Sequence, residues 1–302
     1  MRTKEQKSEP LKAKVVAALL NLLGSVPPRA SYYFVKILAV ILWPFPSKTK
    51  LVINRNLSHC LPQMETEARK RLARATFENT LHSFFEIAYF WVGKLDKYKK
   101  IKISSPEKSQ LDAAVAEGKG VLLACPHLGH WELVNYFLAS HYELLALYRP
   151  PKIAELDDFM TRSRERFGGQ LIPASARGIK TLYRELNHEK VLAILPDQEP
   201  GPTGGVFAPF FGVEAWSMTL VSRLLRKTKA KLLFCFAERL SFSHYKIHIV
   251  QAHEDNYDAD IDTAVRALNA GVEACIMRCP EQYQWSYKRF KSRPNKEPHF
   301  YH

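Results

Sequence analysis

The chain is poor in cysteine, and the cysteines that it has form no recognisable framework. Its 302 residues include five cysteines, an odd number, with no Cys-x2-Cys pair. A disulfide scaffold or a zinc site is therefore not expected. Cys125 lies two residues before His127 and invites a nucleophile reading. It continues an apolar run, however, and a free cysteine in that setting usually packs as a small core residue.

The signatures of three common functions are also absent. There is no Gly-x-Ser-x-Gly element, which argues against a serine hydrolase of the α/β-hydrolase kind. There is no Gly-x4-Gly-Lys-Ser/Thr loop, so nucleotide hydrolysis is not indicated. No helix-turn-helix, RNA-binding or zinc-finger pattern is present, and we expect no nucleic-acid partner.

The chain also lacks a clear membrane-spanning helix, which needs about 18 or more consecutive apolar residues. Residues 15–28 are mostly apolar, and residues 30–46 form a second apolar stretch that Lys36 interrupts. No small-residue cleavage site follows a short apolar core, so a signal peptide is not expected. We predict two helices that lie in one membrane leaflet; the alternative is a buried hairpin of a soluble protein. The expected interfacial anchors are Tyr32, Tyr33, Trp43 and the flanking lysines and arginines.

Acidic residues are too few to balance the basic ones. The chain has 44 Lys and Arg against 30 Asp and Glu, which gives a net charge of +14. Such a charge suits a polyanionic partner, and the apolar amino terminus favours an anionic membrane surface over nucleic acid. The basic clusters are Arg2–Lys14, Lys48–Lys50, Lys94–Lys102, Arg223–Lys231 and Lys288–Lys296.

Short apolar runs alternate with segments of helical periodicity along most of the chain. This alternation predicts an α/β domain with a mainly parallel central sheet flanked by helices. We place it at residues 51–302, after a basic, apolar, membrane-associating segment at residues 1–50. The predicted strands are 121–124, 144–148, 171–173, 191–195, 231–237 and 245–251. The predicted helices are 64–93, 105–118, 131–139, 157–167, 178–186, 217–229 and 262–277, with Ser217 and Asp262 as N-caps of the last two.

The most informative segment is Val121–Glu132, where a buried strand, a stop at Pro126 and a helix start enclose two histidines and a carboxylate. On one regular helix, His127 and Glu132 would lie roughly 140° apart around the axis. They can pair only if His127 lies in the turn and Glu132 reaches back from the first helical turn. An imidazole oriented in this way can accept a proton from a hydroxyl. A solvated or capping histidine is the alternative.

Three polar residues, His127, Arg149 and Asp197, each follow directly after a predicted strand. Ligand sites of parallel sheets lie beyond the carboxyl ends of the strands, so we expect the three to gather at one edge. Arg149 could bind a phosphate or steady an oxyanion, and Asp197 could hold a basic group. Their alternatives are a surface arginine and a turn residue. Among three arginines of the helix 157–167, Arg166 is the best candidate for a phosphate contact, against a solvated helix face.

The His-x4-Glu element, with Gly129 and Trp131 inside it, resembles the acyltransferase motif of the bacterial lipid A late (secondary) acyltransferases. These are the lauroyl and myristoyl transferases of lipopolysaccharide assembly. The resemblance runs from about residue 15 to 293. Where the family often has asparagine, four residues after Arg149, this chain has Ile153, which leaves the acceptor open. The other similar segments, in the family's order, are Asn54–Leu57, Leu147–Pro150, Leu195–Gln198, Gly205–Gly212 and Tyr283–Lys291.

The resemblance implies a fold like that of the glycerol-3-phosphate acyltransferases and an enzyme at the cytoplasmic face of the inner membrane. Its donor would be acyl–acyl carrier protein, or acyl-CoA, and its acceptor a hydroxyl of a phosphorylated lipid A precursor. His127 would be the general base, oriented by Glu132, and neither a metal ion nor a cofactor is expected. The alternatives are acylation of another membrane lipid (a phospholipid, glycolipid or aminolipid), a thioesterase, and a non-catalytic basic lipid-binding protein.

Overall fold

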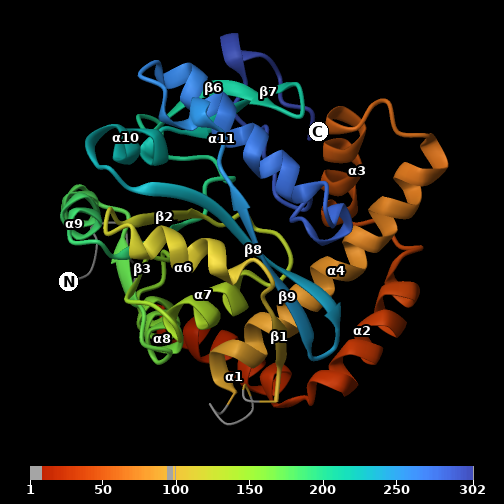
Figure 1. Cartoon of the computed structure of the whole chain (residues 1–302). Helices are drawn as coiled ribbons and strands as arrows, with labels where there is room; N and C mark the ends of the chain where they lie inside the picture. The colour runs from red at the N-terminus through yellow and green to blue at the C-terminus, as the bar shows by residue number, and fades with distance from the viewer. Residues whose placement is uncertain (1–8, 94–97, 99, 302) are drawn as a thin grey trace.

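The computed structural model describes residues 9–93, 98 and 100–301, so parts of the basic clusters Arg2–Lys14 and Lys94–Lys102 lie outside it. Its centre is a seven-stranded sheet with the order β1-β9-β8-β2-β5-β3-β4 (Figure 1). All neighbouring pairs are parallel except β8 and β9, which form an antiparallel hairpin. The predicted α/β fold with a mainly parallel sheet is confirmed. The strands are β1 (Lys102–Ser104), β2 (Val121–Ala124), β3 (Leu144–Tyr148), β4 (Gln170–Pro173), β5 (Val191–Ile194), β8 (Lys231–Ser241) and β9 (His244–Gln251).

Helices cover both faces of this sheet, and each face has its own core. Leu122 points into one core, while its neighbour Leu123 points into the other. Strands that are buried on both faces have continuous apolar runs, which is why β2 and β5 show no alternation of polar and apolar residues. The first core is covered by α3 (Lys48–Cys60), α9 (Ala176–Asn187), α10 (Leu220–Lys227) and α11 (Ile261–Ile276). The second is covered by α6 (Lys108–Ala116) and α7 (Trp131–Ala139).

An antiparallel hairpin of β6 (Gly205–Phe210) and β7 (Val213–Met218) stands apart from the main sheet, and the sequence did not predict it. Ser217 was expected to cap a helix but lies in β7, where its hydroxyl accepts hydrogen bonds from Asn269 and Arg289. The helix α10 begins only at Leu220. The prediction that Asp262 caps α11 is also wrong, because Asp260 accepts the hydrogen bond from the Thr263 amide at 2.9 Å.

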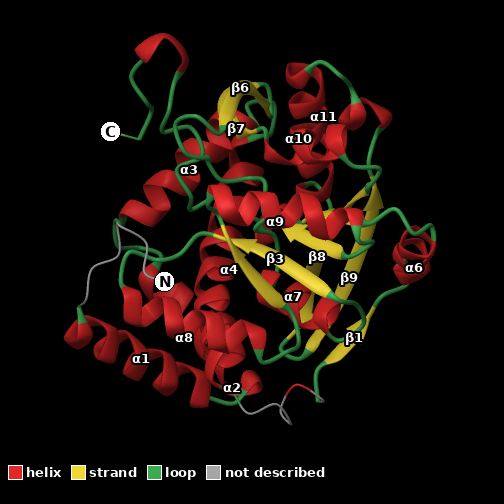
Figure 2. Ribbon diagram, turned by 90° about the vertical axis from the view of Figure 1, so that its left-hand side faces the viewer, coloured by secondary structure: helices red, strands yellow, loops and turns green. Residues whose placement is uncertain are grey.

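Two amino-terminal helices, α1 (Pro10–Ser25) and α2 (Pro28–Leu42), pack along the 27-residue helix α4 (Thr66–Val92). In Figure 2 they lie below the sheet, with α8 (Ala154–Glu165) above α1 and with α9 crossing in front of the sheet. Gly24 lets α1 approach α4 closely, because a Cβ at this position would lie 2.5 Å from the Ala88 carbonyl oxygen. Among the described residues, no helix combines the length and apolar character needed to cross a membrane.

Candidate active site

Two neighbouring strands end in the turns that carry the central residues of the site. His127 follows β2 and Asp197 follows β5, and the two strands pair in parallel up to Ala124 and Ile194. Both turns therefore open at the same edge of the sheet. The turn after β2 also needs Gly129, which has φ +61° and whose Cβ would lie 1.9 Å from the carbonyl oxygen of Ala237. Only glycine fits such a conformation at such close approach.

His127 is held by Asp197 through two hydrogen bonds. Its ring Nδ1 lies 2.8 Å from Asp197 Oδ1, and its backbone N–H donates to Oδ2 at 2.9 Å. The Asp197 side chain is buried, which opposes its ionisation, but the adjacent His127 holds the pKa of Asp197 below its usual value. An ionised carboxylate only accepts hydrogen bonds, so Nδ1 carries the proton and Nε2 presents its lone pair. The sequence-based expectation that Asp197 holds a basic group is met by His127.

The predicted pairing of His127 with Glu132 is wrong. The Glu132 carboxylate instead accepts from Arg164 on α8, whose Nε lies 3.0 Å from Oε2 and whose Nη2 binds Oε1. Glu132 is buried, which disfavours the carboxylate, but the guanidinium holds the pKa of Glu132 below its usual value. The first turn of α7 directs Glu132 toward α8, because a residue on a helix faces the neighbour that lies on its side of the axis. Whether Glu132 takes part in catalysis stays a prediction.

The two other predicted arginines differ in position. Arg149 is exposed at the end of β3 and lines the same cavity as His127. Arg166 does not line it. Its guanidinium donates to the carbonyls of Phe90 and Gly93, at the carboxyl end of α4, and to the hydroxyl of Tyr98. A guanidinium has five donors, which suits the carbonyls left unpaired at a helix end. The contacts of Arg166 are therefore those of a residue that ties α8 to α4.

A cavity of about 540 Å³ opens beside His127 and extends between β3, β5, α7, α8 and α9. Its volume lies within the range of about 300–1,000 Å³ that is typical of small-molecule sites. Polar groups are few and include His127, Gln198, Glu199, Arg149 and the Glu132–Arg164 pair. Much of the remaining wall is apolar and comes from Val134, Leu138, Ala146, Leu147, Met160, Leu171, Ile179, Ala193, Ile194, Leu195, Met218 and Leu220.

Sequence reasoning missed the amides beside His127. Gln198 Nε2 lies 3.2 Å from His127 Nε2 and donates to Gln284 Oε1 at 3.0 Å. Gln284, from the carboxyl-terminal segment, also donates its backbone N–H to the His127 carbonyl at 3.0 Å. Their positions in the sequence could have indicated them, since Gln198 directly follows Asp197 and Gln284 lies in the Tyr-x-Trp segment. Within the described parts of the chain, no three His, Cys, Asp or Glu side chains could hold a metal ion together.

An imidazole held by a buried carboxylate, at the mouth of an apolar cavity at the carboxyl edge of a parallel sheet, is an arrangement typical of enzymes that act on apolar substrates. The comparisons with known proteins give the class. The model of the family "Bacterial lipid A biosynthesis acyltransferase" matches residues 4–292, so the chain belongs to this family and is an acyltransferase.

Curated relatives support this assignment. The chain is 27% identical over 263 residues to the lipid A biosynthesis palmitoleoyltransferase of Escherichia coli (strain K12), with 85% of this chain and 84% of the relative covered. It is 26% identical to the lauroyltransferase of the same organism over 262 residues, with 85% and 84% covered. It is 24% identical to the myristoyltransferase over 250 residues, with 79% and 74% covered. The names of these relatives specify different acyl groups, so they do not define which acyl group this enzyme transfers.

Proposed function

We propose that this enzyme moves a fatty acyl group from a thioester donor to a hydroxyl of a lipid A precursor, with His127 as the general base. The observation that carries the proposal is the His127–Asp197 pair at the mouth of an apolar cavity. Because Asp197 occupies Nδ1, the Nε2 atom of His127 is the one that can accept a proton on the cavity side.

The step needs no enzyme nucleophile. The acceptor oxygen attacks the thioester carbonyl carbon while its proton passes to His127 Nε2, and Asp197 stabilises the imidazolium that forms. The tetrahedral intermediate then collapses, the carbon–sulfur bond breaks, and the proton moves from Nε2 to the departing sulfur. The products are an ester and a free thiol, and no metal ion or cofactor enters the balance.

We assign Glu132 a positioning role in place of the expected contact with His127. Its carboxylate is 3% exposed and holds the Arg164 guanidinium at the cavity wall. A guanidinium kept in place by a carboxylate costs little reorganisation when it meets a polar group of the substrate. Loss of the Glu132 carboxylate would therefore weaken substrate binding more than it would affect proton transfer to His127.

The donor is expected to arrive on an acidic carrier protein, and the surface charge supports this expectation. We define the basic face as the exposed cations Arg177, Lys180, Arg184, Arg223, Arg226, Lys227 and Lys229. Arg184 pairs with Glu185, and no ion pair involves the other six within the described chain. The face lies on α9, on α10 and on the loop that follows α10, and Ile179 of α9 and Leu220 of α10 line the cavity. An acidic protein that docks there would hold its thioester close to the cavity.

Charge reversal tests this carrier assignment. We expect Arg226→Glu combined with Lys227→Glu to raise the KM for a carrier-bound acyl donor about tenfold or more, with the acyl-CoA reaction changed less than twofold. The control is Lys108→Glu on α6, away from the basic face. An equal effect on both donors would count against docking. Loss of vesicle binding without any change in donor KM would assign the basic face to the membrane.

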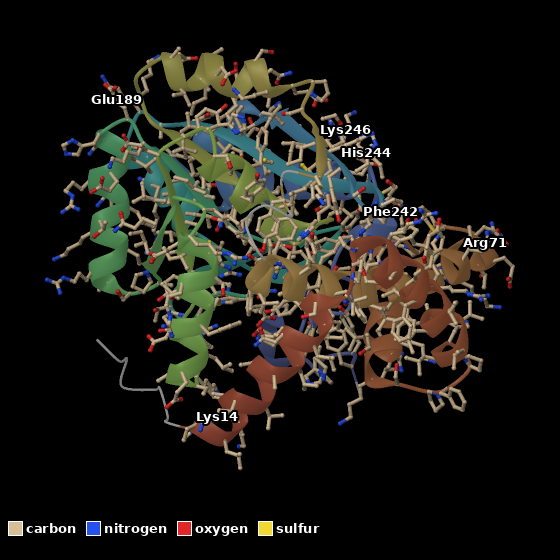
Figure 3. All side chains as sticks on the ribbon, turned by 90° about the horizontal axis from the view of Figure 1, so that it is seen from below. Lys14, Arg71, Glu189, Phe242, His244 and Lys246 are labelled. Carbon is tan, nitrogen blue, oxygen red and sulfur yellow. The ribbon has the colours of Figure 1, made fainter. Side chains whose placement is uncertain are left out.

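We also propose that the amino-terminal segment, residues 1–50, associates with the cytoplasmic face of the inner membrane. The described helices α1 and α2 leave many large apolar side chains exposed, which is unusual for a surface in water. In Figure 3, Phe242 lies beside α2, and its ring packs against Tyr32 and under Arg29. The exposed apolar residues of the two helices are Leu11, Val15, Val16, Leu19, Leu22, Tyr33, Phe34, Ile37, Val40, Ile41 and Leu42.

A vesicle flotation assay tests the membrane proposal. We expect the double variant Ile37→Asp, Val40→Asp to float poorly with anionic vesicles, because two charges on the exposed face oppose insertion into the interface. Arg71→Asp, on the exposed side of α4 labelled in Figure 3, is the control for added negative charge. Equal flotation of the wild type and the double variant would contradict the proposal.

One experiment decides the main proposal. The purified full-length chain is given a labelled acyl thioester and a phosphorylated lipid A precursor, and the products are identified by mass spectrometry. We expect the wild type to form an acylated precursor and His127→Ala to lose activity by about 10³-fold or more. Free fatty acid without acylated lipid would show a thioesterase. Acylation of a different added phospholipid or glycolipid, in preference to the precursor, would assign another acceptor.

A further inference from the structure

The atom that must accept the hydroxyl proton is not free in the structure. His127 Nε2 lies 3.2 Å from the Gln198 amide nitrogen, inside the cavity wall. Since Asp197 fixes the proton on Nδ1, Nε2 is an acceptor, and its neighbour must be a donor. The Gln198 amide therefore directs one N–H at the base atom. Its orientation is fixed by its second N–H, which donates to Gln284 Oε1 at 3.0 Å.

We propose that Gln198 is a catalytic residue that donates a hydrogen bond to the oxyanion of the tetrahedral intermediate. This inference rests on the proposed function of His127. An arriving hydroxyl must donate to Nε2, so it takes the lone pair that Gln198 uses at rest. The N–H of Gln198 is then released next to the reacting atoms. In the tetrahedral intermediate, the attacking oxygen and the former carbonyl oxygen are bonded to the same carbon. The carbonyl oxygen is therefore the acceptor that the Gln198 N–H can reach.

The exchange of partners makes the contact specific to the transition state. The carbonyl oxygen gains negative charge only as the new carbon–oxygen bond forms, and a hydrogen bond to an anion is about twice as strong as one to a neutral acceptor. The donor is preorganised, because Gln284 and the buried neighbour Asp197 restrict the Gln198 segment. Interactions that strengthen in the transition state raise kcat rather than lower KM. On collapse of the intermediate, the carbonyl re-forms, the departing sulfur takes the proton from Nε2, and the Gln198 N–H returns to the freed lone pair of Nε2.

Other side chains with N–H donors line the cavity, and Trp131 and Asn135 are among them. Asn135 donates to the Arg164 carbonyl, and the Trp131 ring centroid lies 5.4 Å from that of His127. Arg164 is engaged by Glu132 through two nitrogens. Arg149 is exposed at the rim. Gln198 alone in this group has an N–H that contacts the base atom itself. A removed oxyanion donor typically costs about 10² to 10³ in kcat.

The test is a comparison of Gln198→Ala and Gln198→Glu in the acyl-transfer assay, with full-length protein and acyl-CoA as the donor. We expect kcat to fall about 10²-fold in Gln198→Ala with KM changed less than threefold. Gln198→Glu keeps the shape but replaces the donor with a carboxylate that repels the oxyanion. It should be at least as inactive. Gln251→Ala, an exposed glutamine of β9, is the matched control.

Each outcome is informative. A Gln198→Glu variant with near wild-type kcat would overturn the proposal, and so would a Gln198→Ala defect confined to KM. A retained KM and an unchanged thermal unfolding midpoint show that the variants are folded. Gln284→Ala should lower kcat less than Gln198→Ala does, because it removes the orienting acceptor and not the donor. Full activity of His127→Ala would instead refute the proposed function, and it is measured separately.

Discussion

Two buried carboxylates each bind a basic side chain that lines the same cavity, and the two pairs differ in which donor or acceptor remains open to the substrate. Both Asp197 and Glu132 are 3% exposed, and both have lowered pKa values because a basic group lies beside them. The Glu132–Arg164 pair is closed, since Arg164 directs two nitrogens at both carboxylate oxygens. In the His127–Asp197 pair, the imidazole keeps one nitrogen for another partner. The difference is that the basic side chain beside Asp197 has a second nitrogen available to the substrate, whereas the nitrogens that Arg164 directs at Glu132 are already occupied.

The largest expected effect comes from Asp197→Asn. An amide can donate to Nδ1 and thereby turn the imidazole to the tautomer with Nε2 protonated, which cannot accept the hydroxyl proton. We expect kcat to fall about 10³-fold with KM little changed, measured by acyl-transfer kinetics. The control is Asp158→Asn, an exposed residue of α8. A loss equal to that of the control would show that Asp197 is not coupled to the base.

Substitutions in the Glu132–Arg164 pair should change the free energy of unfolding. Arg164→Met leaves the Glu132 carboxylate buried without its partner, and breaking such a pair typically costs about 3–5 kcal/mol. The double variant Glu132→Leu, Arg164→Met should regain most of this free energy of unfolding, because it buries no lone charge. Chemical denaturation measures both, and Arg162→Met, an exposed neighbour on α8, is the control. A double variant as unstable as the single one would contradict the pairing argument.

Acid should lower the free energy of unfolding by protonating the buried carboxylates. The folded pKa values of Asp197 and Glu132 lie below their ordinary values of 3.8 and 4.5. The stability that they contribute is therefore fully present above those values and is lost as the pH falls through the folded pKa. Glu86, held by Arg239 with a pKa of about 2, behaves in the same way. We expect the free energy of unfolding to fall below about pH 4.5, and less steeply in Asp197→Asn, in a urea titration series.

The smallest effect is expected at the exposed rim. Arg149→Ala should raise the KM for a phosphorylated acceptor by a few-fold, since a solvent-exposed charge contact contributes about 1 kcal/mol or less. The kcat should change little. Lys152→Ala, an exposed cation three residues on, is the matched control, and a dephosphorylated acceptor should remove the difference. The same KM change with the dephosphorylated acceptor would exclude a phosphate contact.

Sequence patterns correctly placed the site residues at the carboxyl edge of the sheet, but they did not predict which side chains contact each other there. The apolar run 121–124 and its stop at Pro126 gave β2, and the rule for parallel strands brought His127 near Asp197. The partner of His127 could not be read from spacing, because Asp197 lies 70 residues away. The sequence also did not indicate that Arg164 lines the cavity while Arg166 contacts the end of α4. Residues two positions apart on a helix lie roughly 200° apart around its axis, so Arg164 and Arg166 face opposite sides. Which side meets the cavity depends on the neighbouring elements.

The β6–β7 hairpin was missed because its aromatic residues had no visible alternation with polar ones. Residues 205–210 contain no polar side chain, and the turn at Phe211–Gly212 has no Asn-Gly signal. In the structure, both Phe211 and Gly212 have positive φ, which is the conformation of the turns that join tight hairpins. A non-glycine residue rarely adopts it, so the sequence carried no warning.

The carboxyl-terminal segment has a consequence for the order in which the enzyme matures. Tyr283 bridges Leu128, the Gln282 carbonyl accepts from Gly129, and the Gln284 amides contact His127 and Gln198. Synthesis proceeds from the amino terminus, so the helices proposed to meet the membrane emerge before these residues do. A nascent chain would thus be at its lipid surface before its site is closed. Translation itself would keep the acyltransferase inactive until residues 282–284 have emerged and reached the turn that carries His127.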